Sequence, residues 1–448
     1  MSFIANTIPE QAAMLDTIGI RSLEDLWDPI PASIRLNRPL DLSPALDEQN
    51  LVRHLQRIAD ANVHLDRNLS FIGAGIYDHY CPAIVSALAS RGEFATSYTP
   101  YQPEVSQGML QAMYEFQSLI CDLTGMDMAN ASMYDGATAL AEAALMAVEV
   151  TGRTRVAVSE AVHPHYRQVL NTYLRSAGDE MILLPARRGI TDAASFEDLL
   201  KGPPACIIGQ QPNFFGCLED VSNYSNAAVR CGALSIISVD PFTLALLKPP
   251  GEMEIDIVTG EGQSLGLPTG FGGPLLGIFA CKRDYARRLP GRIVGATTDS
   301  EGRRGYVMTL RTREQDIRRE KATSNICTNE ALMALMASIY LVALGKEGLR
   351  ETAEICVQKA HYLQQHLENE LGLKPLFQSK FFCEFAVTLP IDGDELNQRL
   401  LQQGIIGGYN LRRRYPQLPD SMLVCVTETK SRDDLDRFVQ AMKECIAS

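Results

Sequence analysis

A glycine-rich stretch from Gly260 to Gly277 is the part of the chain best suited to hold chemistry. Seven of its eighteen residues are glycine, a density that excludes a helix and lets the backbone approach a ligand closely. The apolar runs 255–258 and 275–280 on either side have the composition of buried strands. Its polar side chains are those of Glu261, Gln263, Ser264 and Thr269. Because the stretch contains no lysine, histidine, cysteine or aspartate, the strongest catalytic residue types are missing from a loop that is otherwise built like an active site.

Further polar residues follow other predicted strands. His163 and the turn 210–213 come after two of these strands, and Asp240 comes after a third. Ligands of open parallel sheets bind at the carboxyl ends of the strands, so three polar strand ends together point to a site. Each of them alone is more often a turn residue.

Two other segments are compatible with either a site or ordinary structure. The stretch 97–108 holds two tyrosines and two prolines, which predicts an ordered loop that is either a surface loop or the lining of a pocket or interface. The small and polar residues 131–138 precede a predicted helix, whose start either binds an anion or is capped by Asp135 or Thr138.

The elements that position these residues alternate along the chain. Strands are predicted at 155–158, 180–184, 205–208 and 234–239, with helices between them, which indicates parallel βαβ units. We expect three regions. They are a helical arm over 1–70, a large α/β domain over 71–330, and a small α/β domain over 331–448 that begins with helices at 330–345 and 349–371.

Composition narrows the class of protein. The 448 residues carry a net charge of −13, which argues against a nucleic-acid surface. Eleven cysteines without a CxxC pair, most of them in apolar runs, are typical of reduced thiols in a cytoplasmic protein and argue against a metal site. We expect no signal peptide and no membrane span. Between Lys282 and Lys321 twelve Lys/Arg face six Asp/Glu, a local excess that is either a solvated surface or a site for an anion or acidic partner.

Several longer strings carry a family resemblance. Taken together, the chain resembles the fold-type I pyridoxal-phosphate enzymes, and among them the alpha subunit (subunit 1) of glycine dehydrogenase (decarboxylating), the P protein of the glycine cleavage system. The resemblance covers essentially the whole chain and implies a large, mostly parallel-sheet domain followed by a smaller α/β domain. The strings are FIGAGIYDHYCP (71–82), SYTPYQPEVSQG (97–108), MYDGATALAEA (133–143), LLKPPGE (246–252), GEGQSLG (260–266) and RTREQDIRREKATSNICTNEAL (311–332).

The resemblance also implies which half of the enzyme this chain is. In that family two homologous halves are fused or encoded separately, and the other half carries the lysine that binds the cofactor, followed by a glycine-rich loop and a proline. Counted back five residues from Pro268, the lysine position is Gln263 here, and glutamine cannot form a Schiff base. The resemblance therefore implies that the partner subunit, rather than this chain, binds pyridoxal phosphate covalently.

Three residues match places in the cofactor site of the other half. Thr138 corresponds to the cup for the cofactor phosphate, and His163 to the histidine that stacks on the cofactor ring. Asp240 lies near the place of the residue that pairs with the pyridine nitrogen. Alpha subunits usually resemble Asn-Pro there, so Asp240 departs from the pattern. We interpret all three as structural relics.

The resemblance implies a shared reaction. With its partner the chain would decarboxylate glycine and pass the aminomethyl group to the lipoyl arm of the acidic H protein. The resemblance implies a complex of two alpha and two beta subunits. Two alternatives remain open: a self-sufficient pyridoxal-phosphate enzyme that uses Lys248, Lys282 or Lys321, and a purely structural subunit. Candidate residues for the active-site mouth are Tyr98, Tyr101, Gln102, Glu104 and Gln107, and those for docking the H protein are Arg311, Arg313, Arg318 and Arg319.

Overall fold

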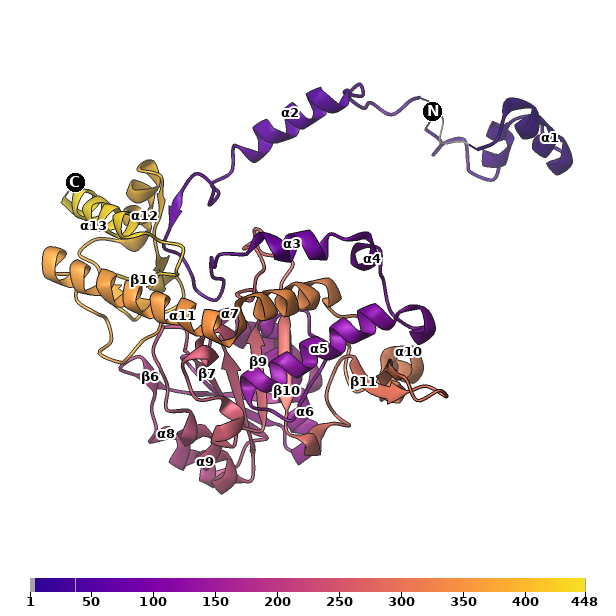
Figure 1. Cartoon of the computed structure of the whole chain (residues 1–448). Helices are drawn as coiled ribbons and strands as arrows, with labels where there is room; N and C mark the ends of the chain where they lie inside the picture. Colours follow the sequence, from indigo (N-terminus) through magenta and orange to yellow (C-terminus); the bar gives the residue numbers. More distant parts are fainter. Residues whose placement is uncertain (1–4, 37, 448) are drawn as a thin grey trace. The chain divides into compact units, whose positions relative to one another are not determined.

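The computed structural model describes residues 5–36 and 38–447, and the chain divides into two compact units, Met1–Val63 and His64–Ser448. The first unit consists of helix α1 (Ile8–Ile18), the 3₁₀ helix η1 (Leu23–Trp27) and helix α2 (Glu48–Ala59) (Figure 1). None of the described residues in these three helices is buried. A segment without a core cannot offset the entropy of ordering its chain, so we expect the arm to need another surface.

A mixed sheet of seven strands forms the centre of the second unit, in the order β2-β10-β9-β8-β7-β3-β4. Strands β9, β8, β7, β3 and β4 run parallel, whereas β10 pairs antiparallel with both β9 and β2. The mostly parallel α/β sheet predicted from the sequence is confirmed. The strands are β2 (Met128–Ala129), β3 (Arg155–Ser159), β4 (Glu180–Leu184), β7 (Cys206–Gln211), β8 (Leu234–Val239), β9 (Ile257–Glu261) and β10 (Gly277–Cys281).

Helices cover both faces of this sheet. Successive strand residues point to opposite faces, so Val156 packs with helices α6 and α7 while Ala157 packs with α5, α9 and α11. The two resulting cores are almost entirely aliphatic and aromatic. Packing in these cores holds the strands in place, and with them the strand ends that carry the polar residues. The helices are α5 (Gln107–Thr124), α6 (Gly136–Thr151), α7 (Pro164–Ala177), α9 (Val221–Cys231) and α11 (Ala331–Leu371).

Helix α11 joins the sheet to the C-terminal part of the unit (Figure 1). The sequence predicts two helices here, and the structure has one element whose backbone departs from helical geometry at Gly345, with φ 63°. Among the described residues, α11 is the helix long and apolar enough to cross a membrane, by length and composition alone. Because α11 packs against the sheet and against α5, we interpret its apolar run as that of a core helix.

The C-terminal part is a small antiparallel sheet, β13-β16-β15, with helices packed on it. The short strand β1 (Leu69–Ser70) pairs with β14 (Ile405–Ile406), and the Phe71 ring stacks on Phe438 at 3.9 Å. Residues 69–71 therefore pack with the C-terminal part rather than with the seven-stranded sheet. Its elements are β13 (Glu384–Thr388), α12 (Gly393–Gln402), β14, β15 (Tyr409–Asn410), β16 (Ser421–Cys425) and α13 (Arg432–Ala447).

A hairpin that the sequence did not predict lies inside the basic stretch. Strands β11 (Ile293–Thr298) and β12 (Arg304–Thr309) pair antiparallel over their whole length. Helix α5 packs against this hairpin, and helix α10 (Gln315–Arg318) follows it. The remaining short elements are α3 (Ala83–Ala89), α4 (Gly92–Ala95), η2 (Pro103–Val105), β5 (Ala186–Arg187), β6 (Ile190–Thr191), α8 (Ser195–Asp198) and η4 (Pro241–Ala245).

Candidate functional site

Gln263, at the expected lysine position, is buried and fully engaged by the backbone. Its Oε1 accepts a hydrogen bond from Tyr77 N at 2.9 Å, and its Nε2 donates to Tyr77 O and Leu267 O, each at 2.9 Å. Only 1% of the residue is exposed. The amide therefore ties the glycine-rich loop to the segment around Tyr77, and an ammonium group could not reproduce the bond that accepts from Tyr77 N–H.

Glu261 places a carboxyl group at the start of helix α6. Its Oε2 accepts from Gly136 N at 3.0 Å, and its Oε1 accepts from Gln263 N at 3.0 Å and Leu276 N at 2.9 Å. Burial raises the pKa of Glu261 to about 7, although the three backbone N–H groups oppose that shift. The free N–H that a helix start would offer to an anion is thus already used by the chain's own side chain.

Thr138 acts as a capping residue at the same helix start. Asp135 Oδ1 accepts from Thr138 N at 2.7 Å, and the Thr138 hydroxyl oxygen accepts from Asp135 N at 3.3 Å. These contacts form a capping box, one of the two structures that the sequence left open at this position.

His163 is held as a neutral ring. Its Nδ1 accepts from His165 N at 3.1 Å, and its Nε2 lies 2.8 Å from Ala74 O, to which it donates. Burial lowers the pKa of His163 to about 4. One face stacks on Tyr166 at 4.8 Å, and a Cβ added to Gly75 would lie 3.0 Å from the ring. The ring is therefore enclosed by the chain itself.

Asp240 caps the turn after strand β8. Its Oδ1 accepts from Phe242 N at 3.0 Å and from the Ser264 hydroxyl at 3.3 Å. Burial raises the pKa of Asp240, which disfavours the charged form that a pyridinium partner needs.

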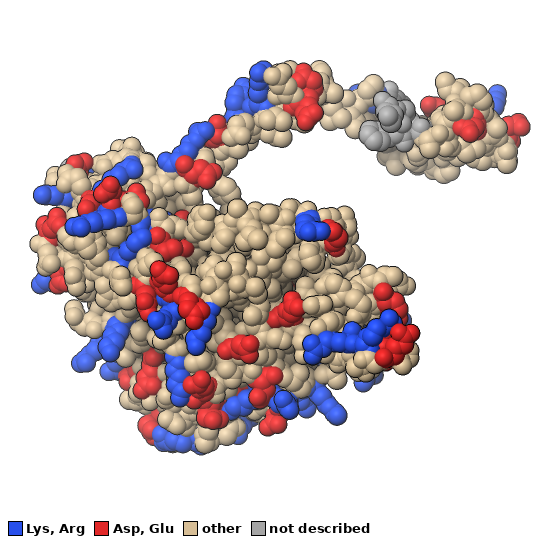
Figure 2. Space-filling view, viewed as in Figure 1, with Lys and Arg blue, Asp and Glu red and all other residues tan. Residues whose placement is uncertain are grey.

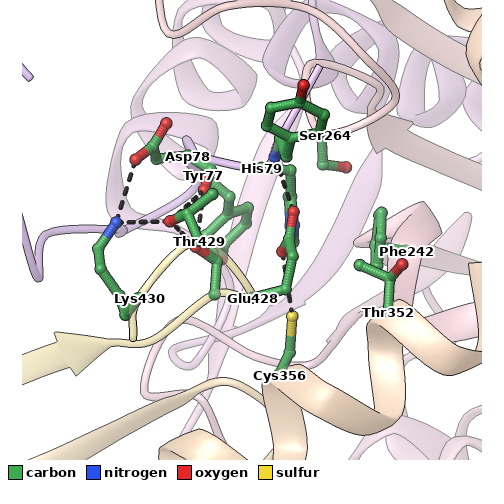
Figure 3. A network of polar contacts seen from close by, with 12 residues as sticks. Tyr77, Asp78, His79, Phe242, Ser264, Thr352, Cys356, Glu428, Thr429 and Lys430 are labelled. Atoms are coloured by element: carbon green, nitrogen blue, oxygen red, sulfur yellow. Dashed lines mark hydrogen bonds and ion pairs between the residues drawn. The ribbon is translucent and has the colours of Figure 1, made fainter. Parts of the chain in front are cut away.

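The segment 73–80 that contacts these residues is fastened to the C-terminal part. Glu384 accepts from Ala74 N at 2.6 Å and from the Tyr77 hydroxyl at 2.7 Å. Lys430 Nζ contacts Asp78 Oδ2 at 3.1 Å, as Figure 3 shows. The segment is therefore held by the C-terminal part and, through Tyr77, by Gln263 of the glycine-rich loop.

A buried triad completes this attachment (Figure 3). His79 Nδ1 lies 2.7 Å from Glu428 Oε2, which also accepts from the Cys356 thiol at 3.4 Å. Burial alone would raise the pKa of Glu428, but the hydrogen bond and charge of His79, together with backbone hydrogen bonds including that from Tyr80 N, outweigh burial and the pKa is lowered. The three potential ligand atoms lie within 4.8 Å of one another. Hydrogen bonds among the three side chains account for this spacing, so we assign the triad a structural role.

These contacts test whether pyridoxal phosphate fits the residues of this chain. A carboxyl group lies at the helix start where the resemblance would put the phosphate, an amide lies at the expected lysine position, and Ala74 and Gly75 lie against the histidine ring. Each feature opposes the cofactor independently. The residues present do not fit it.

The candidate mouth residues lie on a loop tied to the hairpin. Gln107 Nε2 donates to Tyr306 O at 2.8 Å, and Gln107 Oε1 accepts from Tyr306 N at 2.8 Å. Tyr101 lies near two guanidinium groups, 5.1 Å from Arg311 and 5.7 Å from Arg292. Tyr98, Gln102 and Glu104 are exposed. The structure thus brings together Tyr101 of the mouth group and Arg311 of the docking group.

The four candidate docking arginines separate into two pairs. Arg318 and Arg319 are exposed. Arg311 and Arg313 are partly buried. Arg311 contacts Asp316, and Arg313 donates to Gly291 O at 2.9 Å. Arg292, which the sequence did not single out, is 4% exposed and lies with them. No spacing in the sequence marks it, because the hairpin brings it to this place.

Comparison with known proteins assigns the family. The family described as "Glycine cleavage system P-protein" matches residues 1–442. The chain belongs to this P-protein family. A P-protein relative from Thermomicrobium roseum named "Probable glycine dehydrogenase (decarboxylating) subunit 1" is 50% identical over 100% of both chains. Another with the same name, from Desulfitobacterium hafniense, is 49% identical over 99% of this chain and 100% of its own length.

Solved structures agree with this assignment. A crystal structure of glycine decarboxylase (P-protein) of the glycine cleavage system, in inhibitor-bound form, matches with a TM-score of 0.90 and 45% identity, covering 99% of this chain and 100% of that one. A glutamate decarboxylase from Lactobacillus brevis matches with a TM-score of 0.69 at 14% identity, over 93% and 96% of the two chains, which shows a shared fold alone. This P-protein chain therefore has the fold-type I architecture expected from its sequence.

Proposed function

We propose that the chain is the alpha subunit of a cytoplasmic glycine dehydrogenase (decarboxylating) and that its partner, subunit 2, holds pyridoxal phosphate. The observation that carries the proposal is the site around Gln263 and Glu261. It keeps the architecture of a cofactor site, yet its hydrogen bonds are closed within the chain. When bound to the partner, the cofactor would supply the electron sink for decarboxylation.

The assembly with subunit 2, as two alpha and two beta chains, is supported by apolar surface on the second unit. A groove of about 480 Å³ lies between helices α3, α5 and α11. In Figure 2 the area over α3 and the adjacent half of α11 is largely free of Lys, Arg, Asp and Glu, whereas charges of both signs lie over the other half of α11 and below. Such a surface suits an obligate interface of more than about 2,000 Å². The larger apolar side chains that line the groove are those of Ile84, Leu88, Leu119, Leu335, Ile339 and Val342, and Glu115 and Asp122 also line it.

The contribution of this chain to turnover lies in its loops. The Tyr98–Gln107 loop is fixed by its bonds to Tyr306, so little ordering entropy remains when glycine or the lipoyl arm arrives. A tyrosine offers an apolar face and a hydroxyl tip, which suits a channel for a long thioalkyl chain. The exposed Arg318 and Arg319 would attract an acidic H protein.

The two alternatives meet different difficulties. Lys282 contacts Asp256 Oδ1 at 2.8 Å and Glu254 O at 3.1 Å, while Lys248 and Lys321 are exposed, so none of the three takes the place of Gln263. A purely structural subunit would leave turnover intact when the Tyr98–Gln107 loop is changed.

The test is reconstitution from separate chains. Each full-length chain is purified and assayed alone and mixed for glycine–bicarbonate exchange and for aminomethyl transfer to lipoylated H protein. We expect activity only in the mixture, with the cofactor covalently on subunit 2. Activity of this chain alone would support the self-sufficient alternative instead.

A further inference from the structure

Three arginines meet around Tyr101 and Glu314 on the second unit. Arg292 precedes strand β11, and Arg311 and Arg313 follow strand β12, so the hairpin brings them together. The Cζ atoms of Arg292 and Arg311 lie 5.7 and 5.1 Å from the Tyr101 ring centre. The charges of all three arginines act on the Glu314 carboxyl. We call Arg292, Arg311, Arg313, Glu314 and Tyr101 the arginine cluster.

Four polar atoms of this cluster are buried without a partner in the described part of the chain. They are Nε of Arg292, Arg311 and Arg313, and Oε1 of Glu314. Buried polar groups in folded proteins are nearly always hydrogen-bonded, and charged donors are the most costly to leave unpaired. Four such atoms in one place indicate that a partner from outside the chain completes the cluster.

The cluster carries more positive than negative charge, because among the described residues its three arginines face only the Glu314 carboxyl and Asp316, which pairs with Arg311. Arg292 donates to the uncharged oxygens of Asn329 at 3.2 Å and Cys327 at 2.8 Å. Burial lowers the pKa of Arg313, which indicates a cation with too little countercharge. Burial, together with the nearby Asp316 charge, raises the pKa of Glu314 against the pull of the arginines. The missing partner is therefore an anion.

The backbone around the cluster is held in an unfavourable conformation. Leu310 and Arg319, which bracket the loop, both have φ of 53°, a left-handed region that favours glycine. Backbone strain of this kind persists where the surrounding structure demands it, commonly at ligand sites. The loop geometry alone specifies no ligand, but it agrees with the unpaired donors.

We propose that the arginine cluster binds a small planar carboxylate-type anion, with the Tyr101 ring as one wall. Guanidinium forks match the two oxygens of such an anion. This proposal rests on the proposed function, because Tyr101 belongs to the candidate active-site mouth. Two participants in that reaction have the required chemistry: the carboxylate of glycine, and bicarbonate.

The test is a calorimetric titration of the full-length chain with acetate, glycine, bicarbonate and chloride in separate experiments. We expect saturable binding of acetate with one site per chain and no comparable binding of chloride. Preference for glycine or for bicarbonate over acetate identifies the source of the anion. Arg292→Met should weaken binding roughly tenfold or more, because a charge-assisted donor is lost.

Two further variants keep the test decisive. Arg311→Met, at a less buried position, should weaken binding in the same way if Arg292→Met fails to fold. The matched control is Arg303→Met on the same hairpin, an exposed arginine paired with Asp299 at 2.8 Å, which should bind acetate as wild type does. Binding no tighter than that of chloride, or wild-type affinity in both cluster variants, would overturn the proposal.

Assays of the mixed subunits separate this proposal from the proposed function. Carboxylate binding to this chain without glycine decarboxylation in the mixture would support the site and reject the function. Decarboxylation in the mixture, with no binding of any of the three anions to the chain, would reject the site alone.

Discussion

Replacing Gln263 by lysine asks whether one residue or the whole site excludes the cofactor. In the wild-type chain the Gln263 amide accepts from Tyr77 N and donates to Tyr77 O and Leu267 O. A lysine can still donate to the two carbonyls but offers no acceptor, so Tyr77 N–H is left unpaired. An unpaired buried N–H costs about 1–3 kcal/mol.

The new ammonium adds a second cost. Position 263 is 1% exposed, and burial disfavours the charged form of a lysine. We therefore expect Gln263→Lys to lose about 2–4 kcal/mol of unfolding free energy, a large part of a total of roughly 5–15 kcal/mol. The loss is measured as a lower urea midpoint by circular dichroism. An unchanged midpoint would refute the assigned hydrogen bonds.

Cofactor binding by the same variant is the second readout. The variant is incubated with pyridoxal phosphate, dialysed, reduced with borohydride and analysed by mass spectrometry. Because Glu261 and segment 73–80 still oppose the cofactor, we expect neither visible absorbance nor an adduct at position 263. Gln417→Lys, at an exposed position, controls for adventitious surface adducts. A stable adduct at position 263 would show that lysine alone restores the site.

Three other predictions concern the Tyr98–Gln107 loop and one buried carboxyl group. Tyr101→Phe keeps the ring against the arginines, so assembly of the complex should be unchanged. We expect aminomethyl transfer to slow more than glycine–bicarbonate exchange. Equal slowing of both would assign the loop a structural role. Gln107→Leu leaves Tyr306 N–H without its acceptor and should lower the urea midpoint by the equivalent of about 1–3 kcal/mol, and an unaltered midpoint would count against that bond. Burial raises the pKa of Glu384 from 4.5 to about 7, so its contribution to stability is fully present below pH 4.5 and is lost as pH rises through 7, by about 3 kcal/mol. Glu384→Gln should remove that part of the pH dependence in urea titrations between pH 4.5 and 8, and an identical profile would refute the assignment.

Local pattern was sufficient to predict most of the sheet. The run Leu234–Val239 is apolar and rich in β-branched residues, and it forms strand β8 with the predicted bounds. The hairpin β11–β12 was missed because arginine, glycine and threonine interrupt the apolar residues of its strands. Its pairing depends on packing against helix α5, which local composition does not express.

The candidate site was only partly predictable, because its contacts join distant segments. The type of residue 263 was readable from the resemblance, but its bonds to Tyr77 span 186 positions. Glu261 was visible as a polar residue of the loop, yet its place at the start of helix α6 depends on a contact across 125 positions. The sequence thus showed glutamine at the position where the resemblance leads us to expect a lysine, whereas the structure shows the hydrogen bonds that this glutamine makes.

The most direct test of the central claim is to locate the cofactor in the working enzyme. The reconstituted complex of both full-length chains is reduced with borohydride in the presence of pyridoxal phosphate, and each chain is then analysed by mass spectrometry. The account predicts one cofactor adduct on a lysine of subunit 2 and none on this chain. A stoichiometric adduct on this chain, with activity that depends on it, would contradict the account.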